Sequence, residues 1–423
     1  MQTSSKTSGR LRCWSVALFA LVGLTNASAD DVVMTGNAEP RLASIDALMS
    51  GFLTEHKLPG AAVAVSRKGQ VVLARGYGFA DVEQRAAVQP DSLFRIASIS
   101  KPITAVAVLQ LVEQRKLDLD ASAFGVLKWE PHREAGRELD ARLAQVTIRQ
   151  LLQHTGGWDR DKSYDAMFRA VPIAQALGVA PPAKPEHVIR FMLGQPLDFE
   201  PGERYAYSNF GYCVLGRLIE HASGQSYECY VQQHVLQPLG ICSMRIGRTR
   251  RECRWPNEVT YYPHEKPTGI SVFAEDLGQP VPPPYGAWHL EAMDSHGAWV
   301  ASAIDLVKFA AAMDDLASCK LLKSSTIDTM LARPSGAAGL DKDGQPKDAY
   351  YGCGWSVRPV ANQPRPNVWH NGSLPGTSTI LVRRFDGICW AALFNSRGAS
   401  PSAPSSMIDP LMQKTVNQVE QWP

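Results

Sequence analysis

The chain has 423 residues, of which 45% are hydrophobic and 20% are charged, and its formal net charge is +2 at pH 7. These values are typical of a globular protein and exclude a disordered, collagen-like or coiled-coil chain. A chain of this length buries a large core, as one domain with an insertion or as two closely packed domains. The balanced charge gives no reason to expect binding to nucleic acid or to a membrane surface.

The first 29 residues have the order of a secretory signal peptide. Three basic residues precede an apolar run over 14–24, and the small residues Ala27, Ser28 and Ala29 follow it. The run is short for a membrane span, which needs about 20 apolar residues. We therefore expect cleavage after Ala29, export to the periplasm or the medium, and a mature domain over 30–423 without a stable membrane span. Three of the 43 basic residues and none of the 41 acidic ones lie in the segment, so the mature net charge would be −1.

Seven cysteines remain after residue 29, so at least one thiol has no disulfide partner within the chain. No C-x-x-C occurs, which argues against a redox or zinc site. We expect most of these cysteines to be buried as small hydrophobic residues, with Cys242–Cys253 as a candidate local disulfide.

The spacing of apolar residues predicts one helix and two strands at the start of the mature domain, over 42–53, 61–66 and 71–77. A further helix is expected to begin near Ser98, with Pro102 in its first turn. Helices and long loops follow. A capping box at Thr147 predicts a short helix that ends at Gly156-Gly157, and further helices are predicted over 212–221 and 303–313. Residues 254–290 are rich in Pro, Gly and Tyr and predict a surface loop.

Strands return near the C-terminus, over 354–360, 378–383 and 388–394, and a final amphipathic helix is predicted over 407–416. Strands at both ends with helices between them predict an α/β (α+β) fold. Its antiparallel sheet would be built from the N- and C-terminal segments and flanked by helices, with a mostly helical region inserted at about 130–290.

The most informative motif is Ser98-Ile99-Ser100-Lys101, at the predicted start of a helix. Residues three apart share a helix face, so the hydroxyl of Ser98 and the amine of Lys101 can meet. A serine becomes an effective nucleophile when a neighbouring base takes its proton. The motifs Tyr207-Ser208-Asn209 and His370-Asn371-Gly372 follow in order. The patterns S-x-x-K and Y-x-N each occur once in the chain.

These three motifs, in this order, resemble those of the penicillin-recognising serine hydrolases, specifically the class C β-lactamase-like group. The segments PGERYAYSNFGYCVLGRLIEHASGQSY, LLQHTGGW, PLGI and HNGSLPGTS are also similar to recurring segments of this family. The likeness spans roughly residues 41–400. The group includes class C β-lactamases, DD-peptidases, esterases and D-amino-acid peptidases. The resemblance implies a class C β-lactamase-like fold and calls for no metal or cofactor.

The resemblance implies that Ser98 is the acylated nucleophile and that Lys101 and Tyr207 move protons. Lys101 would act as a neutral amine or as a nearby cation. Tyr207 would act as a base if a cation favours its phenolate, and could then protonate the leaving group. Asn209 would hydrogen-bond a substrate amide or orient Lys101. The backbone N–H groups of Ser98 and Ser373 would form the oxyanion hole.

His370 and Gly372 are expected on an edge strand that faces the site, with Gly372 letting the substrate approach the backbone. The β-lactamase pattern has a lysine at the place of His370. Histidine, with an unperturbed pKa of about 6.5, is mostly neutral at pH 7. We therefore expect weak penicillinase activity. His154 is predicted to be structural, and four more residues are candidate pocket residues: Trp158, Tyr285, Trp288 and His296.

The sequence therefore predicts an exported serine hydrolase that cleaves an ester or amide through a Ser98 acyl-enzyme. Its substrate would be a small molecule or a peptide, for instance one derived from the cell wall. Two alternatives stay open. One is a class C β-lactamase or DD-carboxypeptidase. The other is a catalytically silent member that binds peptidoglycan or serves as a scaffold. The sequence does not give the oligomeric state.

Overall fold

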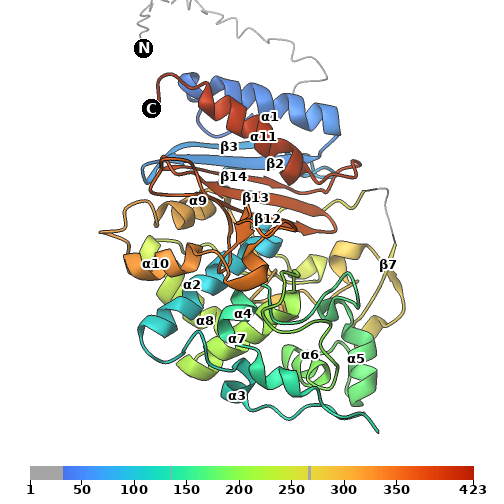
Figure 1. The fold of residues 1–423 in the computed structure, drawn as a ribbon. Coiled ribbons are helices and arrows are strands. Elements are labelled where there is room, and N and C mark those ends of the chain that lie inside the picture. The colour runs from blue at the N-terminus through green and yellow to red at the C-terminus, as the bar shows by residue number, and fades with distance from the viewer. Residues whose placement is uncertain (1–31, 135, 265–267) are drawn as a thin grey trace, which may run out of the picture. The chain divides into compact units, whose positions relative to one another are not determined.

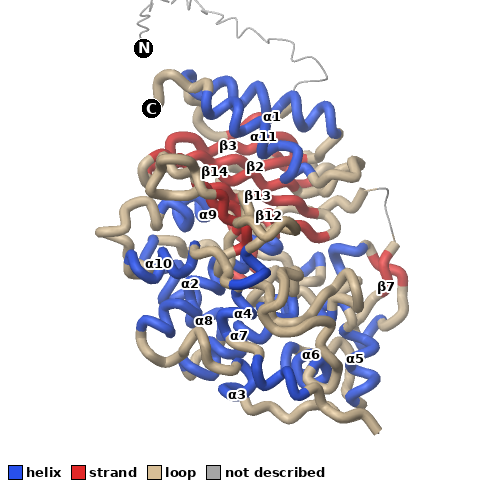
Figure 2. The backbone as a smooth tube through the Cα atoms, viewed as in Figure 1, coloured by secondary structure: helices blue, strands red, loops and turns tan. Residues whose placement is uncertain are grey.

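The computed structural model describes residues 32–134, 136–264 and 268–423. The predicted signal segment lies outside the described residues. Within Val32–Pro423, an antiparallel sheet has helices on both of its faces (Figure 1). Figure 2 shows the strands gathered in this one layer, with a pair of helices on one side and the helical region on the other.

The main sheet is built from the two ends of the chain, which confirms the predicted fold. Among the described residues its strand order is β1-β3-β2-β14-β13-β12-β11-β10, with β4 paired to β3. All of these pairs are antiparallel, and β2 from the N-terminal part lies beside β14 from the C-terminal part. The strands are β1 (Met34–Thr35), β2 (Gly60–Arg67), β3 (Gln70–Asp81), β4 (Ala86–Ala87), β10 (Tyr350–Tyr351), β11 (Ser356–Arg358), β12 (Asn367–Leu374), β13 (Thr377–Arg383) and β14 (Ile388–Phe394).

Strand β2 shows why this sheet needs a cover on both faces. Successive side chains of a strand point to opposite faces. Ala61, Val63 and Val65 belong to the core under the terminal helices α1 and α11, whereas Ala62 and Ala64 belong to the core on the other side. All residues of the strand except the last, Arg67, are buried, so most of the strand is a continuous run of small and apolar residues.

The helices divide between the two faces. The terminal helices α1 and α11 lie together on the outer face of the sheet, and α9 lies on the opposite face near the helical region (Figure 1). The helices are α1 (Ala43–His56), α2 (Ser100–Glu113), α3 (Ala123–Leu127), α4 (Ile148–Leu152), α5 (Ala170–Leu177), α6 (Pro185–Met192), α7 (Asn209–Ser223), α8 (Tyr227–Val231), α9 (Ala303–Ala311), α10 (Ser324–Leu331) and α11 (Pro404–Asn417). Two small sheets complete the described part: β5 (Phe94–Arg95), β6 (Arg245–Ile246) and β9 (Trp299–Ala301) form one, and β7 (Gly269–Ile270) and β8 (Pro280–Val281) the other.

Most predicted helices are present with small changes at their ends. The capping box at Thr147 begins α4 as predicted, but this helix ends at Leu152, before the two glycines. Helix α7 ends at Ser223, and Gly224 takes the left-handed conformation that closes it. The helix expected at Ser98 begins two residues later, because a separate 3₁₀ turn carries the serine.

The expectations for the cysteines were largely wrong. All seven described cysteines are free, and only Cys213, Cys353 and Cys389 are buried. Cys242 and Cys253 are both exposed and form no disulfide.

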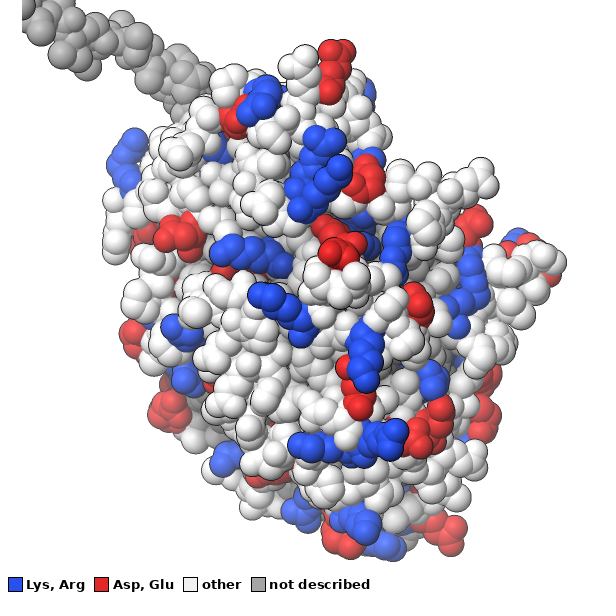
Figure 3. Space-filling view, turned by 90° about the vertical axis from the view of Figure 1, so that its left-hand side faces the viewer, with Lys and Arg blue, Asp and Glu red and all other residues white. Residues whose placement is uncertain are grey.

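The described surface carries charges of both signs. Figure 3 shows Lys and Arg interspersed with Asp and Glu over the face drawn. None of the helices in the described ranges is long and apolar enough to cross a bilayer.

Candidate active site

Ser98 lies on a 3₁₀ turn formed by Ala97–Ile99, directly before α2. Ala97 has a φ of 47°, in the left-handed region that residues with a side chain rarely adopt. Such strain persists only where surrounding contacts impose it, and it is frequent at functional sites. The sharp turn leaves Ser98 partly exposed while Lys101, on the first turn of α2, is fully buried.

The segment before Ser98 is fixed by strands from other parts of the chain. The backbone N–H of Ile96 donates to Trp299 O on β9, at 2.9 Å. Two threonines of β13 donate to the same segment: Thr379 Oγ1 to Ile96 O at 3.0 Å, and Thr377 Oγ1 to Arg95 O at 3.1 Å. The position of the serine is therefore set by the main sheet.

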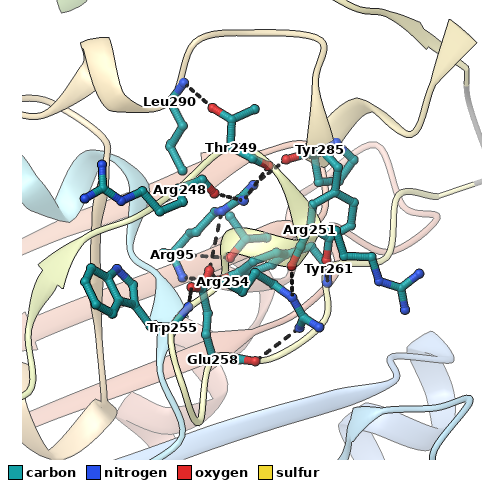
Figure 4. A network of polar contacts seen from close by, with 12 residues as sticks. Arg95, Arg248, Thr249, Arg251, Arg254, Trp255, Glu258, Tyr261, Tyr285 and Leu290 are labelled. Atoms are coloured by element: carbon teal, nitrogen blue, oxygen red, sulfur yellow. Dashed lines mark hydrogen bonds and ion pairs between the residues drawn. The ribbon is translucent and has the colours of Figure 1, made fainter.

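The guanidinium of Arg95 anchors the Pro-rich segment to this strand (Figure 4). It is fully buried, lies 3.7 Å from the carboxylate of Glu258, and donates to Pro284 O at 2.6 Å and Arg248 O at 2.7 Å. The hydroxyl of Tyr261 accepts from the backbone N–H of Arg95 and donates to Glu258, both at 2.8 Å. A buried charge that loses its partner is costly, so this network holds the predicted surface loop firmly against the strand that leads to Ser98.

Lys101 has three polar neighbours, and together they determine what its amine can do. Nζ lies 3.2 Å from Ser98 Oγ, 2.8 Å from Asn209 Oδ1 and 3.0 Å from His296 O. The latter two oxygens can only accept. They take two N–H groups of the amine, so in the neutral form the remaining lone pair is directed at the Ser98 hydroxyl. The arrangement suits removal of the serine proton.

Asp165 fixes the orientation of Asn209, and sequence reasoning did not identify it. Asn209 Nδ2 donates to Asp165 Oδ2 at 2.6 Å. Because a carboxylate accepts, the amide nitrogen must face Asp165 and the amide oxygen must face Lys101. Of the two roles predicted for Asn209, the geometry favours the orientation of Lys101. No motif marks Asp165, since it meets Asn209 only through the fold.

The electrostatics of the site favour a neutral amine. Burial lowers the pKa of Lys101 well below its usual range; the charge of Asp165 acts against this lowering and that of Arg160 reinforces it. The hydroxyl of Tyr207 lies 2.8 Å from Ser98 Oγ. Burial raises the pKa of Tyr207, which favours the phenol over the phenolate. Lys101 is thus the better base, and Tyr207 the better proton donor.

His154 supports the segment that carries Tyr207. Its Nδ1 accepts from the backbone N–H of Ser208 at 3.2 Å, and its backbone oxygen accepts from Ala206 at 2.9 Å. Its ring lies 4.4 Å from that of Tyr207, between ring centroids. Burial lowers the pKa of His154 well below its usual range. These contacts are those of the structural residue that the sequence predicted.

His370 is buried and neutral. Its Nδ1 lies 2.7 Å from Asn371 O, which can only accept, so Nδ1 carries the proton. Nε2 then accepts from the hydroxyl of Tyr351 at 2.9 Å. Burial lowers the pKa of His370 to about 3. The site therefore has no cation at this position at neutral pH.

The structure corrects the expectation that the His370 motif lies on an edge strand. β12 has neighbours on both sides, but its ladder with β11 covers only Asn367–Trp369, whereas its ladder with β13 continues to Leu374. The half of β12 that carries the motif therefore extends past β11. Packing explains why residue 372 is a glycine: a Cβ there would overlap Ile96 O and the Thr379 hydroxyl. The missing side chain lets β12 pack against the turn that carries Ser98, rather than making room for a substrate.

A cavity of about 440 Å³ opens beside the serine and brings most of the predicted residues together. It is lined by Ser98, Tyr207, His370, Gly372 and Ser373, among others. Lys101 and Asn209 are buried and reach Ser98 through the hydrogen bonds described above. The sequence did not point to six further lining residues: Arg160, Tyr205, Tyr351, Ser356, Trp369 and Arg397.

The four candidate pocket residues do not line this cavity. Trp158 packs against Phe210 in the core, at 4.8 Å between ring centroids, and Tyr285 and Trp288 are also core residues. His296 takes part only through its backbone oxygen, which accepts from Lys101. The side chains of Trp158, Tyr285 and Trp288 therefore fill the interior instead of lining the cavity.

A family model described as Beta-lactamase matches residues 45–406. Esterase EstB of Burkholderia gladioli is 35% identical over 223 residues, which are 52% of this chain and 55% of that protein. Protein flp of Staphylococcus aureus (strain MW2) is 32% identical over 196 residues, 46% of this chain and 36% of that protein. The chain thus spans about half, or less, of the length of the curated relatives it matches.

Solved structures show the same architecture. The octameric penicillin-binding protein homologue from Pyrococcus abyssi matches with a TM-score of 0.64 at 27% identity, over 87% of this chain and 77% of that chain. The D-amino acid amidase from Ochrobactrum anthropi SV3 matches with a TM-score of 0.65 at 21% identity, over 88% and 98%. At that identity the second likeness concerns the fold alone.

Proposed function

The chain belongs to the Beta-lactamase family, and from this premise we propose that it hydrolyses a carboxylic ester or amide through an acyl-enzyme on Ser98. The observation that carries the proposal is the placement of Ser98 Oγ, 3.2 Å from Lys101 Nζ and 2.8 Å from the Tyr207 hydroxyl. A nucleophile within hydrogen-bond reach of a base and of a proton donor is the arrangement that acyl transfer needs.

In the proposed reaction Ser98 Oγ forms a bond to the substrate carbonyl carbon while its proton passes to Lys101 Nζ. The backbone N–H groups of Ser98 and Ser373 hold the resulting oxyanion, and such donors stabilise it by about 3 kcal/mol each. Tyr207 gives its proton to the leaving oxygen or nitrogen as that bond breaks, and recovers one from Lys101. Water then attacks the acyl carbon, the bond from that carbon to Ser98 Oγ breaks, and a proton of the water passes to Oγ, which releases the carboxylic acid and restores Ser98.

Two features support an esterase or amidase over a β-lactamase. His370 is buried and neutral, so it provides no cation at the position where β-lactamases have a lysine, and the cations that line the cavity are Arg160 and Arg397 instead. One relative bears the name esterase.

We further propose that residues 1–29 direct export, since they have the order of a signal peptide. A mature N-terminus at Asp30 in protein recovered outside the cytoplasm would support this.

The test compares three substrates with purified protein: p-nitrophenyl acetate, D-phenylalanine amide and the cephalosporin nitrocefin. We expect turnover of the ester or the amide to exceed that of nitrocefin, and Ser98→Ala to abolish it. Ser100→Ala is the matched control, because this neighbouring hydroxyl bonds Ala97 O instead of lining the cavity, and it should stay active. Faster turnover of nitrocefin would identify a β-lactamase. No turnover of any substrate would favour the catalytically silent alternative.

A further inference from the structure

A second cavity of about 200 Å³ adjoins the cavity beside Ser98. The two share four wall residues, Tyr205, Tyr351, Ser356 and Trp369. The second cavity therefore lies directly beside the first, and its other lining residues belong to the segment between α10 and β10 and to β10 itself. None of the residues proposed to take part in catalysis lines it.

The far end of this side cavity is mainly apolar. It is formed by Pro334, Ala338, Ala349 and the ring of Tyr350. The polar ends of two wall residues are already used within the protein. Tyr350 donates its hydroxyl proton to Leu331 O at 2.9 Å, and Lys347 Nζ donates to Ala338 O at 2.9 Å.

The wall between the two cavities is held in place. The hydroxyl of Tyr351 donates to His370 Nε2 at 2.9 Å, and its ring packs against those of His154 and Tyr205, at centroid distances of 4.5 and 5.9 Å. Tyr351 is thus fixed at both its polar end and its ring. This gives His370 a role that does not need charge, because its neutral ring positions the wall of the side cavity.

We propose that the side cavity binds an apolar group of the substrate, of the size of a phenyl ring or a short alkyl chain, while the scissile carbonyl lies at Ser98. This inference rests on the proposed function. An apolar cavity of about 150 Å³ is large enough to hold benzene, so the size fits. The apolar group could belong to the acyl part or to the alcohol or amine part of the substrate, and the experiment separates these sources.

Two series of esters test the proposal on the wild-type protein. The first keeps the p-nitrophenol leaving group and lengthens the acyl chain from acetyl to butyryl and hexanoyl. The second keeps the acetyl group and changes the alcohol from methanol to butanol and benzyl alcohol, with acetate release as the readout. We expect kcat/KM to rise in one series by about fourfold for each methylene that enters the cavity. The series that shows the rise identifies the part that binds.

Two variants then narrow the far end of the side cavity. Ala349→Leu and the milder Ala338→Val should remove the preference for the larger group and leave kcat/KM for methyl acetate, whose acyl and alcohol groups are both too small to fill the cavity, within about twofold. Ala312→Leu, at a half-buried alanine outside both cavities, is the control and should keep the preference.

The outcomes are distinct. If the esters are cleaved but kcat/KM does not depend on the size of the varied group in either series, the inference is overturned and the proposed function stands. A preference that survives both narrowing variants, in folded protein, would also overturn it. Absence of all ester cleavage would overturn the proposed function and this inference with it.

Discussion

Lys101 depends on Asn209 and Asp165 for the direction of its lone pair. The amide oxygen of Asn209 faces Lys101 only because its nitrogen donates to Asp165 at 2.6 Å. The charge of Asp165 also opposes the lowering of the Lys101 pKa by burial. The base is therefore set by a residue that does not touch Ser98.

Asp165→Asn should shift the pH profile of the reaction. Removing the negative charge lowers the pKa of Lys101 further, so the amine stays neutral to lower pH. The acid limb of the pH profile of kcat/KM for p-nitrophenyl acetate should therefore move to lower pH. If Asp165 had a purely structural role, the substitution would reduce the rate without moving this limb. A limb that moves to higher pH would contradict the assignment of Lys101 as the base.

His370→Lys tests charge preference at the position where β-lactamases have a lysine. We expect kcat/KM for an ester with a carboxylate near the scissile bond to improve roughly tenfold relative to a matched neutral ester, since a charge pair at about 4 Å is worth 1–4 kcal/mol. His370→Gln is the neutral control and should leave the ratio near that of the wild type. Because burial lowers the pKa of His370 to about 3, His370 does not titrate between pH 5 and 8. The ratio of the two kcat/KM values in the wild type should therefore not change in this range because of His370. An unchanged ratio in the lysine variant would mean that residue 370 does not set charge preference.

At the scale of elements, the contact between β12 and the Ser98 turn joins the two halves of the site. Gly372 allows this contact, and Thr379 on the neighbouring strand donates to the same Ile96 oxygen. The nucleophile and the His370–Ser373 strand are thus held together by backbone packing.

Gly372→Ala should disturb this contact, because its Cβ would overlap backbone that cannot move aside easily. We expect a loss of about 1–3 kcal/mol in the free energy of unfolding and a fall in kcat/KM at temperatures where the variant is still folded. Gly51→Ala in α1 is the matched control. It has open space around the added Cβ and should stabilise the protein by about 0.5–1 kcal/mol. Equal stability and activity of the two variants, measured by urea unfolding and ester hydrolysis, would refute the packing argument.

At the scale of the whole molecule, the sheet separates two cores, and the C-terminal helix closes the outer one. Ile408, Met412 and Val416 of α11 are buried in this core, whereas Leu411 on the same helix is 40% exposed. The outer core lies on the far face of the sheet from the helical region, so it acts on the site only through the sheet.

Met412→Ala should lower the free energy of unfolding by about 2–5 kcal/mol. Leu411→Ala removes a large apolar side chain from the exposed side of the same helix and should change it by less than about 0.5 kcal/mol. Urea denaturation followed by tryptophan fluorescence measures both. A similar loss in the two variants would mean that α11 is not packed as described.

The fold and much of the site could be predicted because their signals are local. Apolar runs bounded by turn residues mark the long terminal strands, and Ser98 and Lys101 lie one helical turn apart in sequence and in space. The family resemblance added Tyr207, Asn209 and the His370 strand, and the comparisons confirm that resemblance. The roles proposed for these residues remain predictions.

What the sequence could not show depends on contacts between distant segments. Asp165 meets Asn209 across 44 residues, and Tyr351 on β10 meets His370 on β12 across 19 residues that include β11. Residue 372 must be a glycine because a Cβ there would overlap the backbone oxygen of Ile96, which lies in the N-terminal part of the sequence. Pocket residues predicted from aromatic character alone, such as Trp158, proved to be core residues, because a large apolar ring is more often needed for packing.

The central claim is that Ser98 forms a covalent acyl-enzyme, and intact-mass spectrometry tests it most directly. The protein would be incubated with a fluorophosphonate and, separately, with a penicillin. We predict a single fluorophosphonate adduct that maps to Ser98 and is lost in Ser98→Ala. A penicillin adduct that persists would agree with an esterase or peptidase, and hydrolysed drug without a lasting adduct would indicate a β-lactamase. Folded protein that forms no adduct with either reagent would contradict the account.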